Sequence, residues 1–535
     1  LAWLLTFLPG RVMASVRPHT PALLEQIGDA LGRLDAALAG FEHPALDREF
    51  KWNLCQAAWI LPHLKLIDDP RRRDWLARIM DRFTDRVAPR LECLRRGAIF
   101  GDANDHNLLV TDGDQGRQRL AGIVDFGDMC RSVIVGEAAV AAAYAMMGQP
   151  RPLEAAAELI TAYHQAFPLT DDELAVLFPL VLTRLAVSVV NAAVVARERP
   201  GDAYVTVSEA PAWRLLERLH GYDPRLAEAR WRAACGLEAH PGAARVNAWL
   251  RGRAGTFAEV LGPERPAAAG QVLDLSFASI VGGNSLDGFD PAVCAEQVEA
   301  LLGAGGKHVG IGRWGEPRPI YSAPAFGGGD DPLAPRRTRH LGADLFAPAG
   351  TPVRAPLGGE VAAAGWSSQR FDYGGWVLLR HRTDDGDPFM TFYGHLNRSA
   401  FTDLTVGLHI DAGEAFTALG GRPENGGWPP HLHLQLLAAG HEKWGDTPDG
   451  VADPDDFDAC AALYPNPAPL LNLPDEAIRW SGTSLAALRS RRAARFAPNL
   501  RLSYAEPFRP VRGWRHLLYD AEGRAYLDAY NNVPH

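Results

Sequence analysis

Two stretches of the chain place metal-binding side chains at short, regular spacings. The first, RHLGADLFAPAGTPVRAP, sets His340 and Asp344 four residues apart, and the second, WPPHLHLQLL, sets His431 and His433 two residues apart. Two His and one carboxylate can hold Zn²⁺ and leave a fourth position for water, which is the layout of a catalytic zinc site. The spacing alone does not decide which of the imidazoles would bind.

The local sequence predicts extended backbone at both stretches. In HLHLQL, strand alternation puts the two imidazoles and Gln435 on one face and the leucines on the other. In the first stretch Gly342 and Pro348 oppose a helix, so His340 and Asp344 are expected on an extended segment. The two stretches can therefore supply rigidly held side chains to one site.

The chain has 17 His, and any one of them taken alone would be interpreted as a surface residue or a hydrogen-bonded core residue. The order of several motifs is stronger evidence for a metal site. HxxxD, APxGTPVxAP, YGHL and PHLH follow one another, and residues 336–475 resemble the lysostaphin-type zinc metallopeptidases. This resemblance implies a small antiparallel β barrel or sandwich. It also implies that His340, Asp344 and His433 hold Zn²⁺ and that His395 and His431 are the catalytic pair.

In such a peptidase, zinc polarises the attacking water and the scissile carbonyl, while the two His take the proton and stabilise the oxyanion. The chain departs from the family at Leu434 and Gln435, where an aromatic residue and Glu are common. The loop GRPENGGW also lacks the usual Ser-Thr-Gly run. A barrel that binds metal or docks other modules without hydrolysing peptides therefore stays open as the alternative.

A second set of polar residues lies near residue 110. IFGDANDHNLLV and GIVDFGD form an expected hairpin that carries Asp102, Asn107 and Asp125. A carboxylate that orients a hydroxyl, with oxygen ligands for Mg²⁺, is what phosphoryl transfer requires. The alternative is a hairpin whose Asp and Gly serve only as turn residues.

This arrangement resembles the C-terminal lobe of aminoglycoside phosphotransferase and hydroxylysine kinase-like enzymes, over roughly residues 1–225. The resemblance implies that Asp102 is the catalytic base and that Asn107 and Asp125 bind Mg²⁺ with ATP, although Phe100 stands where the family has His. Such kinases need a Lys on a strand of the nucleotide lobe. The four lysines are Lys51, Lys65, Lys307 and Lys443. None of these lysines lies before residue 51, where a strand of the nucleotide lobe could supply it. We therefore expect that the nucleotide lobe is missing and that this chain alone does not transfer phosphate from ATP.

The tail RLSYAEPFRPVRGWRHLLYDAEGRAYLDAYNNVPH resembles the start of class III pyridoxal-phosphate aminotransferases. Because no Lys follows Lys443, the tail cannot form the Schiff base with pyridoxal phosphate. The aminotransferase body is then expected beyond residue 535, in a possible homodimer of the intact protein. The alternative is a simple β-hairpin extension.

Length predicts several domains, and the local patterns together with the resemblances imply a multidomain α+β enzyme. A chain of 535 residues with 47% hydrophobic and 22% charged residues exceeds the size of one core. The expected domains are a helical kinase-like lobe, a helical segment with a Gly- and Pro-rich linker, the peptidase-like β domain and the aminotransferase start. Their expected ranges are 1–225, 226–335, 336–475 and 476–535.

Charge and cysteine usage narrow the partners. A net charge of −10 argues against nucleic acid as a binding partner. Six Cys scattered along the chain are typical of reduced thiols in the cytoplasm. We expect no membrane span, and the opening LAWLLTFLPG reads as the middle of a domain, so the chain is expected to be a fragment of a longer product. A peptide or a small amino alcohol is the expected substrate.

Overall fold

The structure is a computed structural model that divides into two compact units, Leu1–Ala239 and His240–His535. It describes residues 6–113, 116–199, 209–281, 286, 290–303, 308–321, 326–327, 333, 336–398, 402, 404–438, 447–482, 484–497 and 508–529. Lys307, Lys443 and most of the expected linker loop 323–337 lie outside the described residues. The expected domain ranges stay predictions, but residues 271–272 and 310–312 of the expected linker region form strands in the sheet of the second unit.

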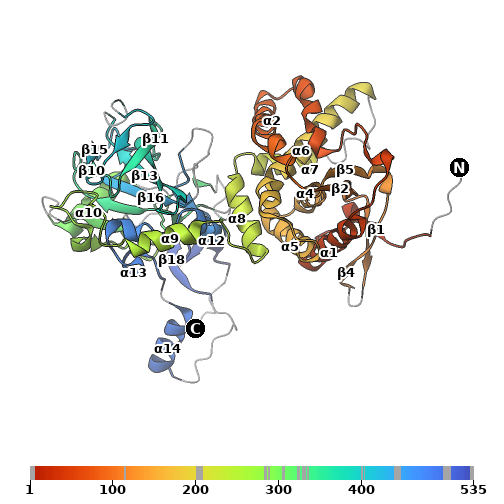
Figure 1. Cartoon of the computed structure of the whole chain (residues 1–535). Coiled ribbons are helices and arrows are strands. Elements are labelled where there is room, and N and C mark those ends of the chain that lie inside the picture. Colours follow the sequence, from red (N-terminus) through yellow and green to blue (C-terminus); the bar gives the residue numbers. More distant parts are fainter. Residues whose placement is uncertain are drawn as a thin grey trace. The chain divides into compact units, whose positions relative to one another are not determined.

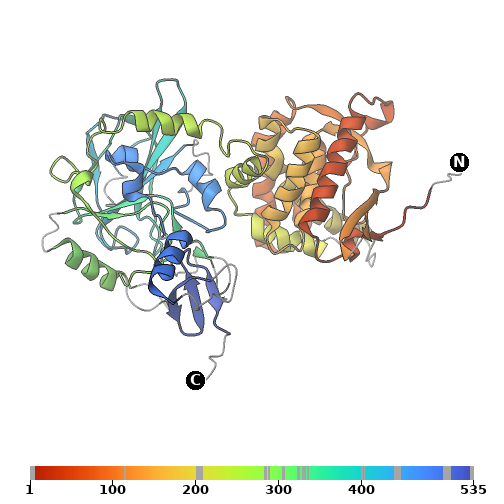
Figure 2. The ribbon, with the colours of Figure 1, turned by 90° about the horizontal axis from the view of Figure 1, so that it is seen from below.

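The first unit is mainly helical, and its helices lie side by side around an apolar core (Figure 2). Its helices are α1 (Pro21–Leu38), α2 (Pro70–Arg82), α3 (Ala88–Leu91), α4 (Val135–Met146), α5 (Pro152–Ala166), α6 (Asp171–Glu198), α7 (Glu209–Leu219) and α8 (Pro224–Ala234). A long 3-10 segment, Leu54–Leu66, precedes α2. A capping box at Thr170 and Glu173 begins α6.

Helix α6 is long and apolar enough to cross a membrane by length and composition. The expectation of no membrane span overlooked the length and apolar composition of this helix. However, 94% of the most apolar 18-residue stretch of this helix is buried inside the protein, as is typical of a helix in a protein core.

The expected hairpin is present in the first unit. Strands β3 (Leu108–Asp112) and β4 (Gln118–Ile123) pair antiparallel, and β1 (Arg11–Val12) adds a third strand. A second pair joins β2 (Arg96–Ile99) to β5 (Cys130–Val133). The motif GDANDHN therefore lies between β2 and β3.

The second unit is built on an open eight-stranded sheet with the order β14-β11-β12-β13-β16-β9-β7-β6 (Figure 1). No closed sheet appears among the residues described, so the expected small barrel is not shown and a sheet-rich fold takes its place. The strands are β6 (Gln271–Val272), β7 (Gly310–Gly312), β9 (Ala343–Phe346), β11 (Gly359–Trp366), β12 (Gly375–Arg382), β13 (Pro388–Leu396), β14 (His409–Ile410) and β16 (His431–Leu437).

Short pairs and helices surround this sheet. The pairs join β8 (Arg339–His340) to β17 (Val451–Ala452) and β10 (Pro352–Arg354) to β15 (Ala415–Ala418). The helices are α9 (Ala243–Gly252), α10 (Pro291–Leu302), α12 (Phe457–Leu463), α13 (Asp475–Ile478) and α14 (Leu485–Arg495). A three-stranded sheet near the C-terminus contains β18 (Pro510–Trp514), β19 (Leu517–Asp520) and β20 (Ala525–Leu527).

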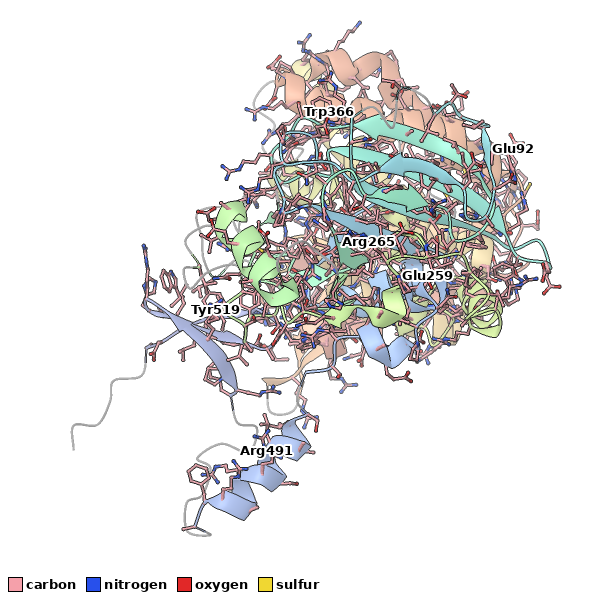
Figure 3. The ribbon with its side chains drawn as sticks, turned by 90° about the vertical axis from the view of Figure 1, so that its left-hand side faces the viewer. Glu92, Glu259, Arg265, Trp366, Arg491 and Tyr519 are labelled. Carbon is pink, nitrogen blue, oxygen red and sulfur yellow. The ribbon has the colours of Figure 1, made fainter. Side chains whose placement is uncertain are left out.

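The small C-terminal sheet packs against the peptidase-like part through an aromatic contact. Tyr519 on β19, labelled in Figure 3, stacks on Phe277, and the ring centroids are 5.5 Å apart. Glu522, in the turn after β19, forms an ion pair with Arg339 of β8. These contacts hold the C-terminal sheet of β18, β19 and β20 next to β8, the strand that contains His340.

Candidate metal centre and carboxylate site

Strand pairing brings the two distant His motifs together. Asp344 on β9 lies directly opposite His433 on β16, and Gly394 on β13 flanks His433 on the other side. The leucines of β16 face the hydrophobic core, and the polar face of the same strand is also buried. The sequence prediction that His431, His433 and Gln435 share one face agrees with this strand.

Three potential ligand atoms converge between β8, β9 and β16. His340 Nε2 lies 3.0 Å from His433 Nδ1 and 3.2 Å from Asp344 Oδ1, and His433 Nδ1 lies 3.1 Å from the same oxygen. The three residues form a group that could hold a metal ion. The structure therefore unites the predicted ligand set.

Hydrogen bonds fix which nitrogen of each ring carries the proton. His340 Nδ1 is 3.0 Å from the carbonyl oxygen of Arg313, and His433 Nε2 is 3.0 Å from Gln435 Oε1. Because these oxygens only accept, both ring nitrogens must donate, which leaves lone pairs on His340 Nε2 and His433 Nδ1. Gln435 is itself oriented by donating to the carbonyl of Asp449 (2.9 Å).

The donor set fits a zinc ion. Two imidazole lone pairs and a carboxylate oxygen point at one another without a hydrogen between them, an arrangement that a cation stabilises. Their separations approach the edge of about 3.3 Å that a tetrahedron with zinc–nitrogen distances of 2.0–2.1 Å requires. A cavity of about 40 Å³ adjoins the three side chains and also His395 and His431, which gives room for an ion and a water.

The two other predicted His flank this centre. The rings of His395 and His431 have centroids 4.3 Å apart, and His431 Nε2 lies 3.7 Å from Asp344 Oδ1. His395 Nδ1 donates to the carbonyl of Asn425 (3.0 Å), and His431 Nδ1 donates to that of Pro429 (2.6 Å). Both rings therefore keep an unprotonated Nε2 that can accept a proton.

His395 adopts an unusual backbone conformation, with φ at 65°. Its N–H donates to the carbonyl of Tyr373, and its carbonyl accepts from the N–H of Gly420, both at 2.9 Å. A non-glycine residue in this region is strained, so these two bonds hold a geometry that aims the imidazole into the site.

Burial and neighbouring charges set the ionisation of the centre. Burial, followed by the charge of Arg318, lowers the pKa of His340 to about 4. Burial also lowers the pKa of His395 and His431, so these rings are neutral at neutral pH. Burial alone would raise the pKa of Asp344, but His340 and Arg318 hold it well below its ordinary value, so it is a carboxylate.

Gly342 makes room for the ligands. A Cβ atom there would lie 2.6 Å from His433 Cε1 and 2.7 Å from the carbonyl oxygen of Leu434. The glycine that sequence analysis used only as an argument against helix is thus needed for close approach of β16.

In the first unit the structure brings Asp102 and Asn107 into contact. Asp102 Oδ2 accepts from Asn107 Nδ2 at 2.7 Å and from Asn104 Nδ2 at 2.8 Å. The N–H of Val124 donates to the carbonyl of Asn107 (3.0 Å). Because Asp125 is the next residue, the hairpin places the DFG motif beside Asn107. Burial raises the pKa of Asp102, although Arg184 opposes the shift.

Two arginines of these sites were missed by the sequence reasoning. Arg184, in the middle of the apolar helix α6, lies 3.4 Å from Asp102 Oδ1. Arg318, before the expected peptidase domain, lies 2.5 Å from Asp344 Oδ2. A charged residue inside an otherwise apolar helical run was the available signal for Arg184. The segment GRWGEPRP gave no comparable signal, because alternating charges are ordinary in surface loops.

Comparison with known proteins matches two families to separate parts of the chain. Residues 1–177 match the Phosphotransferase enzyme family, and residues 338–443 match Peptidase family M23. Neither match extends past residue 443, so the likeness of the tail to aminotransferases and the requirement for pyridoxal phosphate stay predictions.

Individual relatives include a kinase and a peptidase. Hydroxylysine kinase of Bos taurus is 31% identical over 240 residues, covering 43% of this chain and 64% of the relative. Lysostaphin of Staphylococcus simulans is 32% identical over 112 residues, covering 21% of each chain. The chain thus spans less than two thirds of the length of either relative.

Among solved structures, the catalytic domain of lysostaphin from Staphylococcus simulans is 27% identical and covers 22% of this chain and 79% of that chain, with a TM-score of 0.16. Residues 1–177 of the chain are thus similar to the Phosphotransferase enzyme family, and residues 338–443 are similar to Peptidase family M23.

Proposed function

We propose that the second unit is a zinc-dependent peptidase module that hydrolyses a peptide bond. The observation that carries this proposal is the convergence of three lone-pair donors within 3.0–3.2 Å of one another, beside two imidazoles with unprotonated Nε2 atoms. His340, Asp344 and His433 would hold the metal. A bound zinc ion would supply Lewis-acid chemistry, which acidifies water and polarises a carbonyl.

The two flanking imidazoles perform the proton transfers. His431 Nε2, or the neighbouring His395 Nε2, accepts a proton as the water oxygen bonds to the scissile carbonyl carbon. The rings are too close for both to become cationic at once, since two like charges repel in a buried site. The single imidazolium donates a hydrogen bond to the oxyanion and then gives its proton to the amine as the C–N bond breaks.

Space for the peptide adjoins the catalytic pair. A cavity of about 300 Å³ borders His395 and His433 and is walled by the rings of Phe371, Tyr373 and Trp428. Its size falls in the range of ligand pockets. We propose that the residues on either side of the scissile bond lie here.

Metal analysis and peptide digestion of the same samples test this proposal. Wild type should retain about one zinc ion per chain, whereas His340→Ala and His433→Ala should lose it. His409→Ala, at an exposed position of β14, is the matched control and should keep the metal. His431→Ala should keep zinc but lose hydrolysis of a peptide library. Zinc without cleavage of any peptide by wild type would favour the metal-binding or docking alternative.

We also propose that the first unit is the acceptor-substrate part of a small-molecule kinase. This rests on the contact of Asp102 with Asn107 and on the similarity to hydroxylysine kinases. Asp102 would orient the hydroxyl of a small amino alcohol, and Asn107 and Asp125 would bind Mg²⁺ with ATP. Calorimetry should show tighter binding of hydroxylysine than of lysine, which lacks the hydroxyl, and Asp102→Ala should abolish the difference. Equal binding of both amino acids by wild type would contradict this role.

A further inference from the structure

The metal centre receives support from a segment that precedes the region matching Peptidase family M23. Arg313 and Arg318 both lie before residue 338, where that match begins. The carbonyl of Arg313 accepts from His340 Nδ1 at 3.0 Å, and Arg318 Nη1 lies 2.5 Å from Asp344 Oδ2. One short segment thus contacts two of the three potential ligands from behind.

Arg318 is held in a fully buried network. Its side chain is 1% exposed, and its Nε donates to Glu316 Oε2 at 3.0 Å. Glu316 is also fully buried, and its other oxygen accepts from Arg313 Nη2 at 2.5 Å and from the N–H of Leu275 at 3.1 Å. Both oxygens of Glu316 are therefore occupied, so its carboxylate serves to hold the two arginines.

The sheet provides the space for this contact. Gly312 on β7 lies directly opposite Asp344 on β9. A Cβ atom at residue 312 would lie 2.6 Å from Arg318 Nη2 and 3.3 Å from Asp344 Oδ2. The absence of a side chain at this position lets the guanidinium group reach the carboxylate.

The two oxygens of Asp344 face different partners. Oδ1 faces the lone pairs of His340 and His433, at 3.2 and 3.1 Å, whereas Oδ2 is occupied by Arg318. A carboxylate that is free at both oxygens can bind a metal through both. A charge-assisted hydrogen bond to Oδ2 restricts the carboxylate to one ligand atom and fixes its plane.

We propose that Arg318 is a positioning residue of the metal centre, which makes Asp344 bind the metal through Oδ1 alone. This inference rests on the proposed zinc site. Glu316 completes the device, because it balances the buried guanidinium and fixes its orientation. The functional metal unit then begins before residue 338 and includes Arg313–Arg318.

The test compares zinc affinity, measured by chelator competition, with the spectrum of the cobalt-substituted protein. Arg318→Met combined with Glu316→Gln removes both charges of this ion pair, so that neither partner is left as a buried ion without the other. We expect zinc affinity to fall about 10–100-fold, as is typical when a partner of a metal ligand is lost. We also expect weaker visible absorption of cobalt, because Asp344 would bind through both oxygens and raise the coordination number.

Two further variants separate positioning from folding. Arg318→Lys keeps a cation near Oδ2 and should restore part of the zinc affinity and of the four-coordinate cobalt spectrum. Arg354→Met removes a half-buried arginine that bonds the carbonyl of Gly413 away from the centre, and it should leave both measurements unchanged.

The outcomes distinguish this inference from the proposed function. If wild type binds zinc and the double variant keeps its affinity and cobalt spectrum, Arg318 is only structural and the inference is wrong. If Arg354→Met and Arg318→Lys lose zinc affinity equally, the inference is also wrong, because the loss would then result from general destabilisation of the protein. If wild type binds no zinc at all, the proposed function fails first.

Discussion

The two carboxylates at the centres of the two units, Asp344 and Asp102, have opposite environments. Asp344 is bonded by Arg318, whose charge helps to hold its pKa well below the ordinary value. Asp102 has a side chain that is 15% exposed and is bonded by the neutral amides of Asn104 and Asn107, and burial raises its pKa. A permanent anion suits a metal ligand, whereas a carboxylate with a raised pKa suits a proton acceptor. The surroundings therefore assign different chemistry to the same side chain.

Removing the charge at each centre is the strongest way to break this comparison. Asp344→Asn should lower the free energy of unfolding of the second unit by about 1.5–3 kcal/mol, because Arg318 loses one of its two buried charged partners. Asp102→Asn should change that of the first unit by less than about 1 kcal/mol, because a raised pKa means that its charged form already disfavours folding. Pulse proteolysis in urea, with fragments assigned to each unit, measures both values. Equal losses would show that the two environments do not differ in energy.

The contact between Gln435 and His433 offers a smaller test within the metal centre. Gln435→Leu removes the acceptor for His433 Nε2–H, so zinc affinity should fall about 10–100-fold, which chelator competition measures. Gln435→Glu supplies an acceptor again and should restore the affinity. If the Leu variant binds zinc as tightly as wild type, the proton on His433 is not controlled by this residue.

Buried carboxylates of the first unit extend the comparison to pH. Burial, followed by repulsion from Glu137, raises the pKa of Asp35 to about 9, and Tyr163 donates a hydrogen bond to its Oδ2. The folded state therefore keeps a proton that the unfolded state loses above pH 4. The stability of the first unit should fall as pH rises from about 4 to 9, by up to about 1.4 kcal/mol per pH unit.

Asp35→Asn should flatten this dependence, because Asn cannot ionise. Urea unfolding of wild type and variant at pH 5, 6.5 and 8 measures the two slopes. The remaining slope should come largely from Glu137, whose pKa burial raises to about 7. Parallel slopes in the two proteins would show that Asp35 is charged in the folded unit.

The sequence predicted those parts of each site that depend on local periodicity. Strand alternation placed His431 and His433 on one face, and the turn residues between two apolar runs predicted the hairpin of β3 and β4. It did not predict the open eight-stranded sheet, because closure depends on how β6 and β7 pair, and that is a contact between distant segments. The segment before residue 336 was treated as a linker because Gly and Pro are its visible features.

The sequence by itself determined which side chains were available for metal binding and phosphoryl transfer, since residue type and spacing decide what chemistry a short segment can offer. Only the tertiary structure decided how those side chains behave. Pairing of β7, β9 and β16 set Gly312, Asp344 and His433 side by side. That register admits Arg318 and buries the centre. Both the proton positions and the charge of Asp344 follow from burial and long-range contacts that no local pattern encodes.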